Sequence, residues 1–426
     1  MPSSKTFCLG ISHHNTPVAL REALSSQPEA LAQVLVDRPD LADAVAEWAV
    51  VSTCNRFELY AQLAPEVSQG EQLLLSWLAL SRGLPAEQLR PHYASHRAEA
   101  VARHLLQVAA GLDSQVLGEP QILGQVAAAF AAAREEKTTG PYLTALFQAA
   151  IRAGKRARTE TAISRRPASI SSVAVSHIEA SNGPLAAQNI LVIGAGEMAE
   201  LAVNSLRKRG ASQIALVNRT RERALDLLGD GAGCVYRLDQ IHEALVAADA
   251  VISATGAPHL ILTEELIASV QTARAGRPLL LVDIALPRDI DPAVRELAGV
   301  NLINLDTLHD SLEEARQARA QEVPGVKQIV REELATWRQQ VRQLQIRPVI
   351  RELRQKAEVI RENQVERTLK FLGDVDPATR DQIRHLSQAL VNQLLHEPTN
   401  KLREEAVNGA TPELASAVRE LFNLEA

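Results

Sequence analysis

The stretch NILVIGAGEMA, residues 189–199, decides the fold of the middle of the chain. An apolar run at residues 189–193 that is typical of a buried strand leads directly into a glycine-containing turn, and a helical pattern follows as far as Arg209. Further short apolar runs alternate with helical segments at residues 214–217, 250–253 and 279–282. Strands that alternate with helices in this way predict a doubly wound parallel sheet.

The turn carries the pattern Gly-x-Gly-x-x-Ala, a variant of the dinucleotide-binding fingerprint in which helix N–H groups bind a pyrophosphate. About 20 residues further on, where a carboxylate would bind the 2′-hydroxyl of NAD, the chain has Arg219, which can pair with a 2′-phosphate. We therefore expect NADP(H) rather than NAD(H). The cofactor-binding residues are expected to be Gly194, Ala195, Gly196, Glu197, Met198, Ala199, Asn218, Arg219 and Thr220. Alternatively, the glycines only form a tight turn and Arg219 is a solvated surface charge.

Length and composition set the limits around this segment. A chain of 426 residues suggests roughly two to four domains, and 46% apolar with 23% charged residues is ordinary for a folded protein. The net charge of −6 excludes a uniformly basic nucleic-acid coat but not a local basic stripe. The three cysteines form neither a disulfide framework nor a zinc site, so a reducing cytoplasm is expected. No apolar run has the length of a signal peptide or a membrane span.

The pattern divides the chain into three parts. Residues 1–160 are expected to form an α+β domain, with strands at 6–11, 48–52 and 57–63 and helices at 66–80, 98–110 and 122–135, and with another helix that begins at Pro17. Residues 161–310 hold the parallel sheet. Residues 311–426 are expected to be helical, with a long linking helix that Pro324 and Pro348 kink or interrupt. Two more helices are expected near residues 377–395 and 411–422.

Cys54 is the candidate nucleophile. It lies in a short turn between two expected strands, next to Arg56, whose guanidinium can lower the pKa of a thiol. A thiolate beside a hydride donor suggests attack on an activated acyl group to give a thioester, which is then reduced to an aldehyde. Cys8 and Cys234 lie in apolar segments and are expected to be core residues.

Residues 111–125 combine polar groups, three glycines and apolar anchors. This mixture favours a loop and helix start that line a pocket for a small polar group, where Glu119 or Arg56 binds an ammonium or a carboxylate. The alternative is a simple helix cap and connector. His104, on the helix before this segment, is a candidate for proton transfer, whereas His13, His14, His92 and His96 are expected to lie mostly on the surface or in packing.

Several motifs resemble those of the glutamyl-tRNA reductase family. The similarity runs over essentially the whole chain, at residues 10–18, 52–60, 111–125, 194–199, 218–220 and 283–291. The cysteine motif and the Leu-Gly-Glu-Pro-Gln-Ile motif of residues 117–122 are highly specific, whereas the dinucleotide motif is shared with many dehydrogenases. The resemblance implies that Cys54 attacks the ester of glutamyl-tRNA(Glu), that NADPH reduces the thioester to glutamate-1-semialdehyde, and that this step begins porphyrin synthesis through 5-aminolevulinate. It implies that His104 is important for activity, as base or orienter. The implied substrate-binding residues are Thr53, Asn55, Arg56, Ser114, Glu119, Pro120, Gln121 and Gln125.

The resemblance also implies a homodimer joined through the C-terminal helical domain, and an aminomutase that takes up the aldehyde is a possible partner. Two other functions remain open on the residues. An NADP-dependent dehydrogenase of a small hydroxy acid would explain residues 194–220 without Cys54, and a non-catalytic tRNA-binding regulator would need only a basic surface. Basic residues for phosphate contact occur along residues 316–356 and at Arg152, Lys155, Arg156, Arg158, Arg165 and Arg166, although they can equally be solvated helix faces.

Overall fold

The computed structural model describes residues 5–12, 16, 28–53, 55–114, 116–165, 167, 169–229, 233–408 and 411–424. Internal contacts divide the chain into two compact units, one formed by Met1–Thr161 with Val323–Ala426 and the other by Ala162–Glu322. The expected helix that begins at Pro17 lies outside the described residues, as do Cys54 and Arg166.

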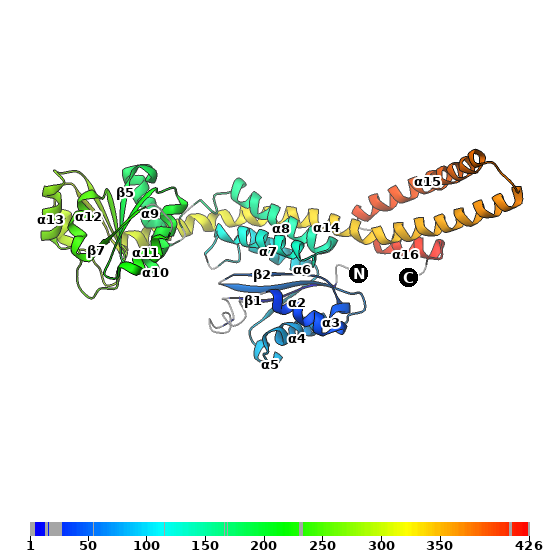
Figure 1. Cartoon of the computed structure of the whole chain (residues 1–426), viewed down its shortest axis with the longest axis horizontal. Coiled ribbons are helices and arrows are strands. Elements are labelled where there is room, and N and C mark those ends of the chain that lie inside the picture. Colours follow the sequence, from blue (N-terminus) through cyan, green and yellow to red (C-terminus); the bar gives the residue numbers. More distant parts are fainter. Residues whose placement is uncertain are drawn as a thin grey trace. The chain divides into compact units, whose positions relative to one another are not determined.

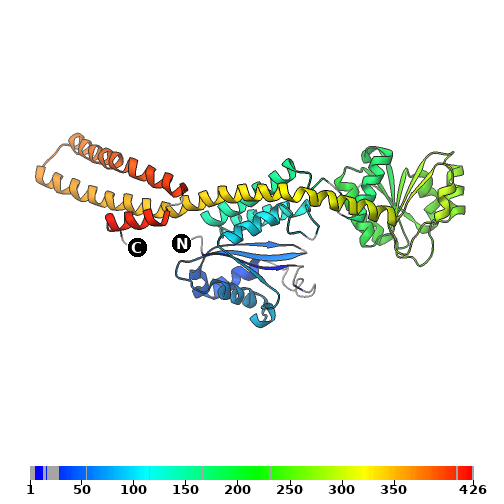
Figure 2. The same ribbon diagram turned by 180° about the vertical axis from the view of Figure 1, so that it is seen from behind.

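The N-terminal part of the first unit is built on a four-stranded antiparallel sheet with the order β2-β3-β1-β4. Its strands are β1 (Thr6–Ser12), β2 (Val45–Ser52), β3 (Arg56–Leu63) and β4 (Ala94–Arg97). One face is covered by α2 (Pro28–Asp37), α3 (Pro39–Ala44), α4 (Gly70–Arg82) and α5 (Ala86–Leu89), and the other by α6 (Glu99–Ala109), α7 (Gln121–Glu135) and α8 (Pro141–Glu160) (Figures 1 and 2). Because helices cover both faces, every residue of the central strand β3 is buried.

The two faces of β3 differ in chemistry. Phe57 and Leu59 point into an apolar core with Trp77 of α4, which meets Trp48 edge to face at a ring distance of 5.5 Å. Successive residues of a strand point to opposite faces, so Arg56, Glu58 and Tyr60 share the face under α6–α8. The interior on that side of the sheet therefore contains a polar stripe.

The C-terminal part of the first unit is helical. Helix α14 (Leu305–Leu372) begins in the second unit and continues into the first, where α15 (Pro377–Asn408) and α16 (Thr411–Leu421) follow it. Of the two effects expected of proline in the long helix, a kink or an interruption, the interruption is wrong, because α14 is continuous through Pro324 and Pro348. A proline removes one helical hydrogen bond, but the residues beside both prolines are anchored, since Val326 and Val349 are buried. Val349 belongs to a core that α14 forms with α15 and α16.

The second unit is a six-stranded, fully parallel sheet with the order β10-β9-β8-β5-β6-β7. Its strands are β5 (Asn189–Ile193), β6 (Gln213–Asn218), β7 (Gly233–Arg237), β8 (Ala250–Ser253), β9 (Leu279–Asp283) and β10 (Val300–Ile303). Its helices are α9 (Ile170–Asn182), α10 (Glu197–Lys208), α11 (Arg221–Leu228), α12 (Ile241–Ala247) and α13 (Glu264–Ala273), with short 3-10 turns at Leu185–Ala187, Leu238–Gln240 and Pro292–Glu296. Separate apolar cores lie on the two faces of the sheet.

The doubly wound sheet expected from the sequence is confirmed, and β5 and β8 have the predicted bounds. The strand order reverses between β5 and β8, which is where open parallel sheets bind ligands. Cys8 is buried as expected, but the expectation for Cys234 is wrong: it is exposed, because β7 is an edge strand. Among the described helices, none is long and apolar enough to cross a membrane.

Candidate active site

The turn between β2 and β3 is organised by Thr53. Its hydroxyl oxygen accepts hydrogen bonds from the backbone N–H groups of Asn55 and Arg56 at 3.2 and 3.1 Å, and its own N–H donates to the Arg56 carbonyl at 2.8 Å. Cys54, the sequence-predicted nucleophile between Thr53 and Asn55, lies outside the described residues. The structure therefore describes the residues that flank it.

A small pocket lies beside this turn. It is lined by Thr53, Asn55, Arg56, Ser114, Glu119, Ile122 and Gln125. All but Ile122 were predicted from the sequence to bind substrate, so the fold brings together residues from the β2–β3 turn, the 111–119 loop and α7. The other two predicted residues, Pro120 and Gln121, are exposed at the start of α7 and do not line the pocket.

The polar atoms of the pocket suit a small polar ligand. Among the described residues, the Ser114 hydroxyl is a buried group without a hydrogen-bond partner in the protein. Buried polar groups normally have a partner, so this hydroxyl marks a position where a ligand atom can bind. Glu119 supplies a carboxylate and Gln125 an amide, which together can bind both an ammonium and a carboxylate.

Close contact between two glycines shapes the loop of the pocket. Gly118 donates its N–H to the Gly111 carbonyl at 2.8 Å, and both residues have positive φ angles, 75° and 77°. A Cβ atom on Gly111 would lie 2.9 Å from the Cα of Gly118, so only glycine fits there. Arg158 stabilises the end of the loop, because its Nη2 donates to the Glu119 carbonyl at 3.0 Å. Its Nη1 donates to the carbonyls of Ala109 and Gly154.

Beneath the pocket, Glu58 is the centre of a buried ionic cluster. Its Oε1 lies 2.7 Å from both Arg56 Nη1 and His104 Nε2, and its Oε2 accepts a hydrogen bond from the Tyr60 hydroxyl at 2.6 Å. The Glu58 side chain is 1% exposed, that of Arg56 is 2% exposed and that of His104 is 15% exposed. Asp113 completes the cluster, with Oδ2 3.1 Å from Arg56 Nη1. Glu58, Tyr60 and Asp113 were not among the site residues predicted from the sequence.

Charge pairing determines the protonation of this cluster. Burial by itself would raise the pKa of Glu58, but the charge and hydrogen bond of His104, with the charge of Arg56, lower it to about 2. Burial likewise opposes the charged form of His104, yet the Glu58 carboxylate outweighs it and raises the pKa of this histidine. His96, stacked on His104 at a ring distance of 4.2 Å, has a lowered pKa because of burial and the neighbouring charge.

Within the described part of the chain, Cys8, Glu58 and His104 also lie close enough together to resemble a set of metal ligands. The Glu58 oxygens already accept hydrogen bonds from three side chains, and burial raises the pKa of the Cys8 thiol well above its usual value. A protonated thiol and an occupied carboxylate are poor ligands for a divalent ion. The chemistry of this group therefore fits an internal hydrogen-bond cluster and does not fit a metal site.

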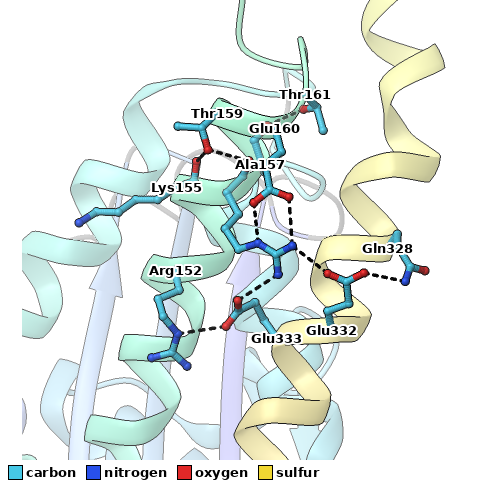
Figure 3. A network of polar contacts seen from close by, with 10 residues as sticks. Arg152, Lys155, Ala157, Thr159, Glu160, Thr161, Gln328, Glu332 and Glu333 are labelled. Atoms are coloured by element: carbon cyan, nitrogen blue, oxygen red, sulfur yellow. Dashed lines mark hydrogen bonds and ion pairs between the residues drawn. The ribbon is translucent and has the colours of Figure 1, made fainter.

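Two members of the predicted basic cluster, Arg152 and Arg156 of α8, form ion pairs inside the protein. Arg152 pairs with Glu333 of α14 at 3.0 Å, and Arg156 pairs with Glu332, Glu333 and Glu160 at 2.8, 3.2 and 2.7 Å (Figure 3). In the 316–356 stretch, Arg338, Arg342 and Lys356 likewise bind groups of the first unit. These arginines are therefore structural contacts between helices, a role that neither sequence interpretation anticipated.

The dinucleotide motif of the second unit has the geometry that a pyrophosphate requires. Gly194 has φ +112°, and a Cβ there would lie 2.5 Å from the Ala254 carbonyl oxygen. Gly196, the N-cap of α10, has open space around its Cβ position, so a ligand can approach the helix N-terminus. Ala199 is buried in the sheet–helix core. Within the described residues Arg219 is exposed and has no ion-pair partner.

Residues of the 283–291 motif stabilise the loop after β8, which lies next to this site. The buried carboxylate of Asp283 accepts hydrogen bonds from the N–H groups of Ala285, Asp289 and Ile290, each at 3.1 Å. The Asp289 carboxylate in turn accepts from the Ser253 hydroxyl at 2.7 Å and from the N–H and hydroxyl of Thr255 at 2.9 and 2.5 Å. This lattice fixes the loop after β8, whose Ala254 carbonyl contacts Gly194.

These features define the class of the protein: a nicotinamide-dinucleotide-binding sheet combined with an α+β domain that holds a separate polar pocket. Comparison with known proteins agrees with this class. Residues 9–161 match the family model for the glutamyl-tRNA(Glu) reductase N-terminal domain, residues 176–311 match shikimate / quinate 5-dehydrogenase, and residues 325–424 match the glutamyl-tRNA(Glu) reductase dimerisation domain.

The match extends over the whole chain. It is 38% identical to glutamyl-tRNA reductase of Geobacter sulfurreducens, over 98% of this chain and 96% of the relative, and 34% identical to that of Bacillus subtilis, over 98% and 91%. The solved glutamyl-tRNA reductase of Methanopyrus kandleri is similar with a TM-score of 0.76 and 30% identity, covering 98% of this chain and 99% of that one. The chain belongs to the glutamyl-tRNA reductase family. A small hydroxy-acid dehydrogenase accounts only for the central match.

Proposed function

We propose that this chain catalyses the NADPH-dependent reduction of the glutamyl group of glutamyl-tRNA(Glu) to glutamate-1-semialdehyde, with release of tRNA, as the first step towards 5-aminolevulinate and porphyrins. The observation that carries the proposal is the small pocket, whose lining includes the residues on either side of Cys54. It occurs in a chain whose full-length relatives bear the name glutamyl-tRNA reductase.

Cys54 is the proposed nucleophile. Its sulfur attacks the ester carbonyl carbon of the glutamyl group, the bond to the ribose oxygen breaks, and the ribose oxygen leaves with a proton. Thr53, Asn55, Ser114, Glu119 and Gln125 hold the glutamyl group in the pocket, and Glu119 is the proposed partner of its ammonium. Arg56 already binds two carboxylates, so we assign it to the frame of the pocket as well as to substrate binding. Pro120 and Gln121 are proposed to act from the pocket's rim.

The proposed cofactor is NADPH. The hydride that it supplies when bound reduces the thioester to the aldehyde and frees the Cys54 thiolate. Gly194, Gly196 and the α10 N-terminus suit the pyrophosphate, while Arg219 is available for the 2′-phosphate. The dinucleotide residues predicted from the sequence are retained as the proposed site: Gly194, Ala195, Gly196, Glu197, Met198, Ala199, Asn218, Arg219 and Thr220.

Each of the three domains predicted from the sequence has a proposed role. Residues 1–160 are proposed to recognise glutamyl-tRNA, residues 161–310 to bind NADPH, and residues 311–426 to form a homodimer, which the dimerisation-domain match supports. An aminomutase that receives the aldehyde directly and a cytoplasmic location remain further proposals.

Acylation without NADPH tests the proposal directly. The full-length chain is incubated with glutamyl-tRNA(Glu), and intact mass should show a hydroxylamine-sensitive glutamyl adduct that is absent from Cys54→Ser. Subsequent addition of NADPH should release an aldehyde. A non-catalytic tRNA-binding protein would give no adduct, and reductase activity that persists in Cys54→Ser would refute the thioester route.

A further inference from the structure

The position of Glu58 is unusual for a carboxylate. It lies in the middle of a fully buried strand and contacts three side chains that belong to two elements: Arg56 and Tyr60 on β3 and His104 on α6. The chain makes room for it, because a Cβ on the neighbouring Gly10 of β1 would lie only 3.3 Å from the Glu58 Cγ. A buried carboxylate costs free energy unless its partners compensate it, so this arrangement calls for an explanation beyond packing.

Charge balance shows what the carboxylate does to His104. Among the residues that the structure describes, the charged or titratable groups that face this histidine are Glu58 and Arg56 of β3, Asp113 after α6, and His96 of β4, with the protonated Cys8 and Tyr60 behind them. If His104 is an imidazolium, the two cations His104 and Arg56 balance the carboxylates of Glu58 and Asp113. If it is neutral, the cluster carries an uncompensated negative charge, shared between the buried Glu58 and the partly exposed Asp113.

We propose that Glu58 is a positioning residue that holds His104 as an imidazolium, so that His104 acts as the proton donor in acyl transfer and not as the general base. The proposal rests on the proposed function and assigns the step in which the histidine acts. The step starts from the Cys54 thiolate, whose proton has been lost to solvent. As its sulfur–carbon bond forms and the carbon–oxygen bond breaks, His104 transfers a proton to the departing ribose oxygen, and solvent then reprotonates the histidine.

The ion pair with Glu58 favours a donor over a base, because it stabilises the imidazolium, in which both ring nitrogens carry a proton. With Nε2 hydrogen-bonded to a carboxylate at 2.7 Å, this nitrogen retains its proton and cannot accept another one. In the charged form the second ring nitrogen also carries a proton and is available for donation. The His104 side chain is 15% exposed, whereas that of Glu58 is buried. Arg56, which forms an ion pair with Glu58, also lines the pocket.

The first test measures the histidine itself. In the full-length chain labelled at histidine Cε1, the His104 signal is assigned by comparison with His104→Gln and titrated in the wild type and in Glu58→Gln. We expect its pKa to lie above 6.5 in the wild type, because the Glu58 carboxylate stabilises the imidazolium. In Glu58→Gln we expect this pKa to fall by at least about one unit, which is a tenfold change in proton affinity. This measurement does not require catalysis, so its result is independent of the proposed function.

The second test follows acyl-enzyme formation against pH without NADPH. A proton donor predicts a rate that falls as pH rises through the His104 pKa, and Glu58→Gln should move this limb to lower pH. Glu47→Gln is the matched control: Glu47 is another buried glutamate of the domain, whose carboxylate accepts the N–H groups of Tyr142 and Leu143 at 3.0 and 2.7 Å. It should weaken the fold without moving the pH limb.

Three results would overturn the proposal. Two of them are a His104 pKa that is the same in folded Glu58→Gln and wild type, and a rate that rises with pH through that pKa, as a base requires. If Glu58→Gln does not fold, Glu58→Asp keeps the charge but lengthens the contact, and it should lower the His104 pKa by a smaller amount. A wild-type His104 pKa below 6.5 would refute the proposal without any variant.

Discussion

Two buried aspartates of the dinucleotide unit should respond differently to the same substitution. Asp283 accepts three backbone N–H groups, which cannot turn away. Asp289 accepts one backbone N–H and two hydroxyls, of Ser253 and Thr255, which can rotate to accept instead of donate. Replacing aspartate by asparagine therefore has the same small steric effect at both sites. Its effect on the hydrogen bonds differs between them.

The expected magnitudes follow from these partners. In Asp283→Asn, whichever way the amide turns, its NH2 group faces at least one N–H donor that is left unsatisfied. The loss of one buried bond and of the charge-assisted strength of the others should destabilise the unit by about 2–4 kcal/mol. In Asp289→Asn, the amide oxygen can keep the Thr255 N–H and the hydroxyls can reorient, so we expect about 1 kcal/mol. Removal of a buried charge offsets part of the cost at both sites.

Hydrogen exchange resolves the second unit from the rest of the chain. All three tryptophans, Trp48, Trp77 and Trp337, lie in the first unit, so tryptophan fluorescence reports that unit alone and serves as an internal control. Exchange of peptides from β8 and β9, read by mass spectrometry, should be accelerated roughly tenfold for each 1.4 kcal/mol lost, and much more strongly in Asp283→Asn than in Asp289→Asn. Equal acceleration in the two variants, or the reverse order, would refute the argument from rotatable donors.

Two further predictions concern the ligands. Arg219→Ala should reduce the preference for NADPH over NADH at least tenfold in kcat/KM, because the paired 2′-phosphate loses its guanidinium; an unchanged ratio would mean that this arginine does not read the phosphate. Replacing Arg152 and Arg156 together by alanine should destabilise the α8–α14 contact by about 1 kcal/mol, since the arginines are partly exposed, and fluorescence of Trp337 next to Glu333 on α14 reports this. The tRNA affinity and its salt dependence should change less than twofold, whereas a salt slope reduced by about 2 would show that these arginines contact phosphates.

Much of the dinucleotide unit could be predicted because parallel strands covered on both faces are continuous apolar runs. Residues 189–193 and 250–253 are such runs, and their bounds were found directly. Cys234 shows the limit of this reasoning. Its local sequence looks like that of a core strand, but only the strand order reveals that β7 lies at the edge of the sheet.

The pocket lining was also accessible to sequence reasoning, because Thr53, Asn55 and Arg56 adjoin one another and Ser114, Glu119 and Gln125 fall in one polar segment. The cluster beneath it was not. In RFELYAQL, residues 56–63, polar and apolar residues alternate, and this pattern normally indicates a strand with one face in water. The polar face is buried only because α6–α8 cover it. Likewise, nothing near Arg152 in the sequence indicates that its partner Glu333 is 181 residues away.

The two buried carboxylate centres differ in what surrounds them, and this separates their response to pH. Glu58, whose pKa is lowered to about 2, stabilises the folded state fully above its ordinary value of 4.5 and loses this contribution as pH falls through about 2. His104, whose pKa is raised, contributes fully below its ordinary value of 6.5 and loses its contribution as pH rises through the raised pKa. The pair therefore stabilises the N-terminal domain most between these limits. Burial raises the pKa of Asp283, whose partners are backbone N–H groups, so no neighbouring cation among the described residues holds this carboxylate in its ionised form. The two centres therefore differ in direction: partner charges lower the pKa of Glu58, whereas burial raises that of Asp283.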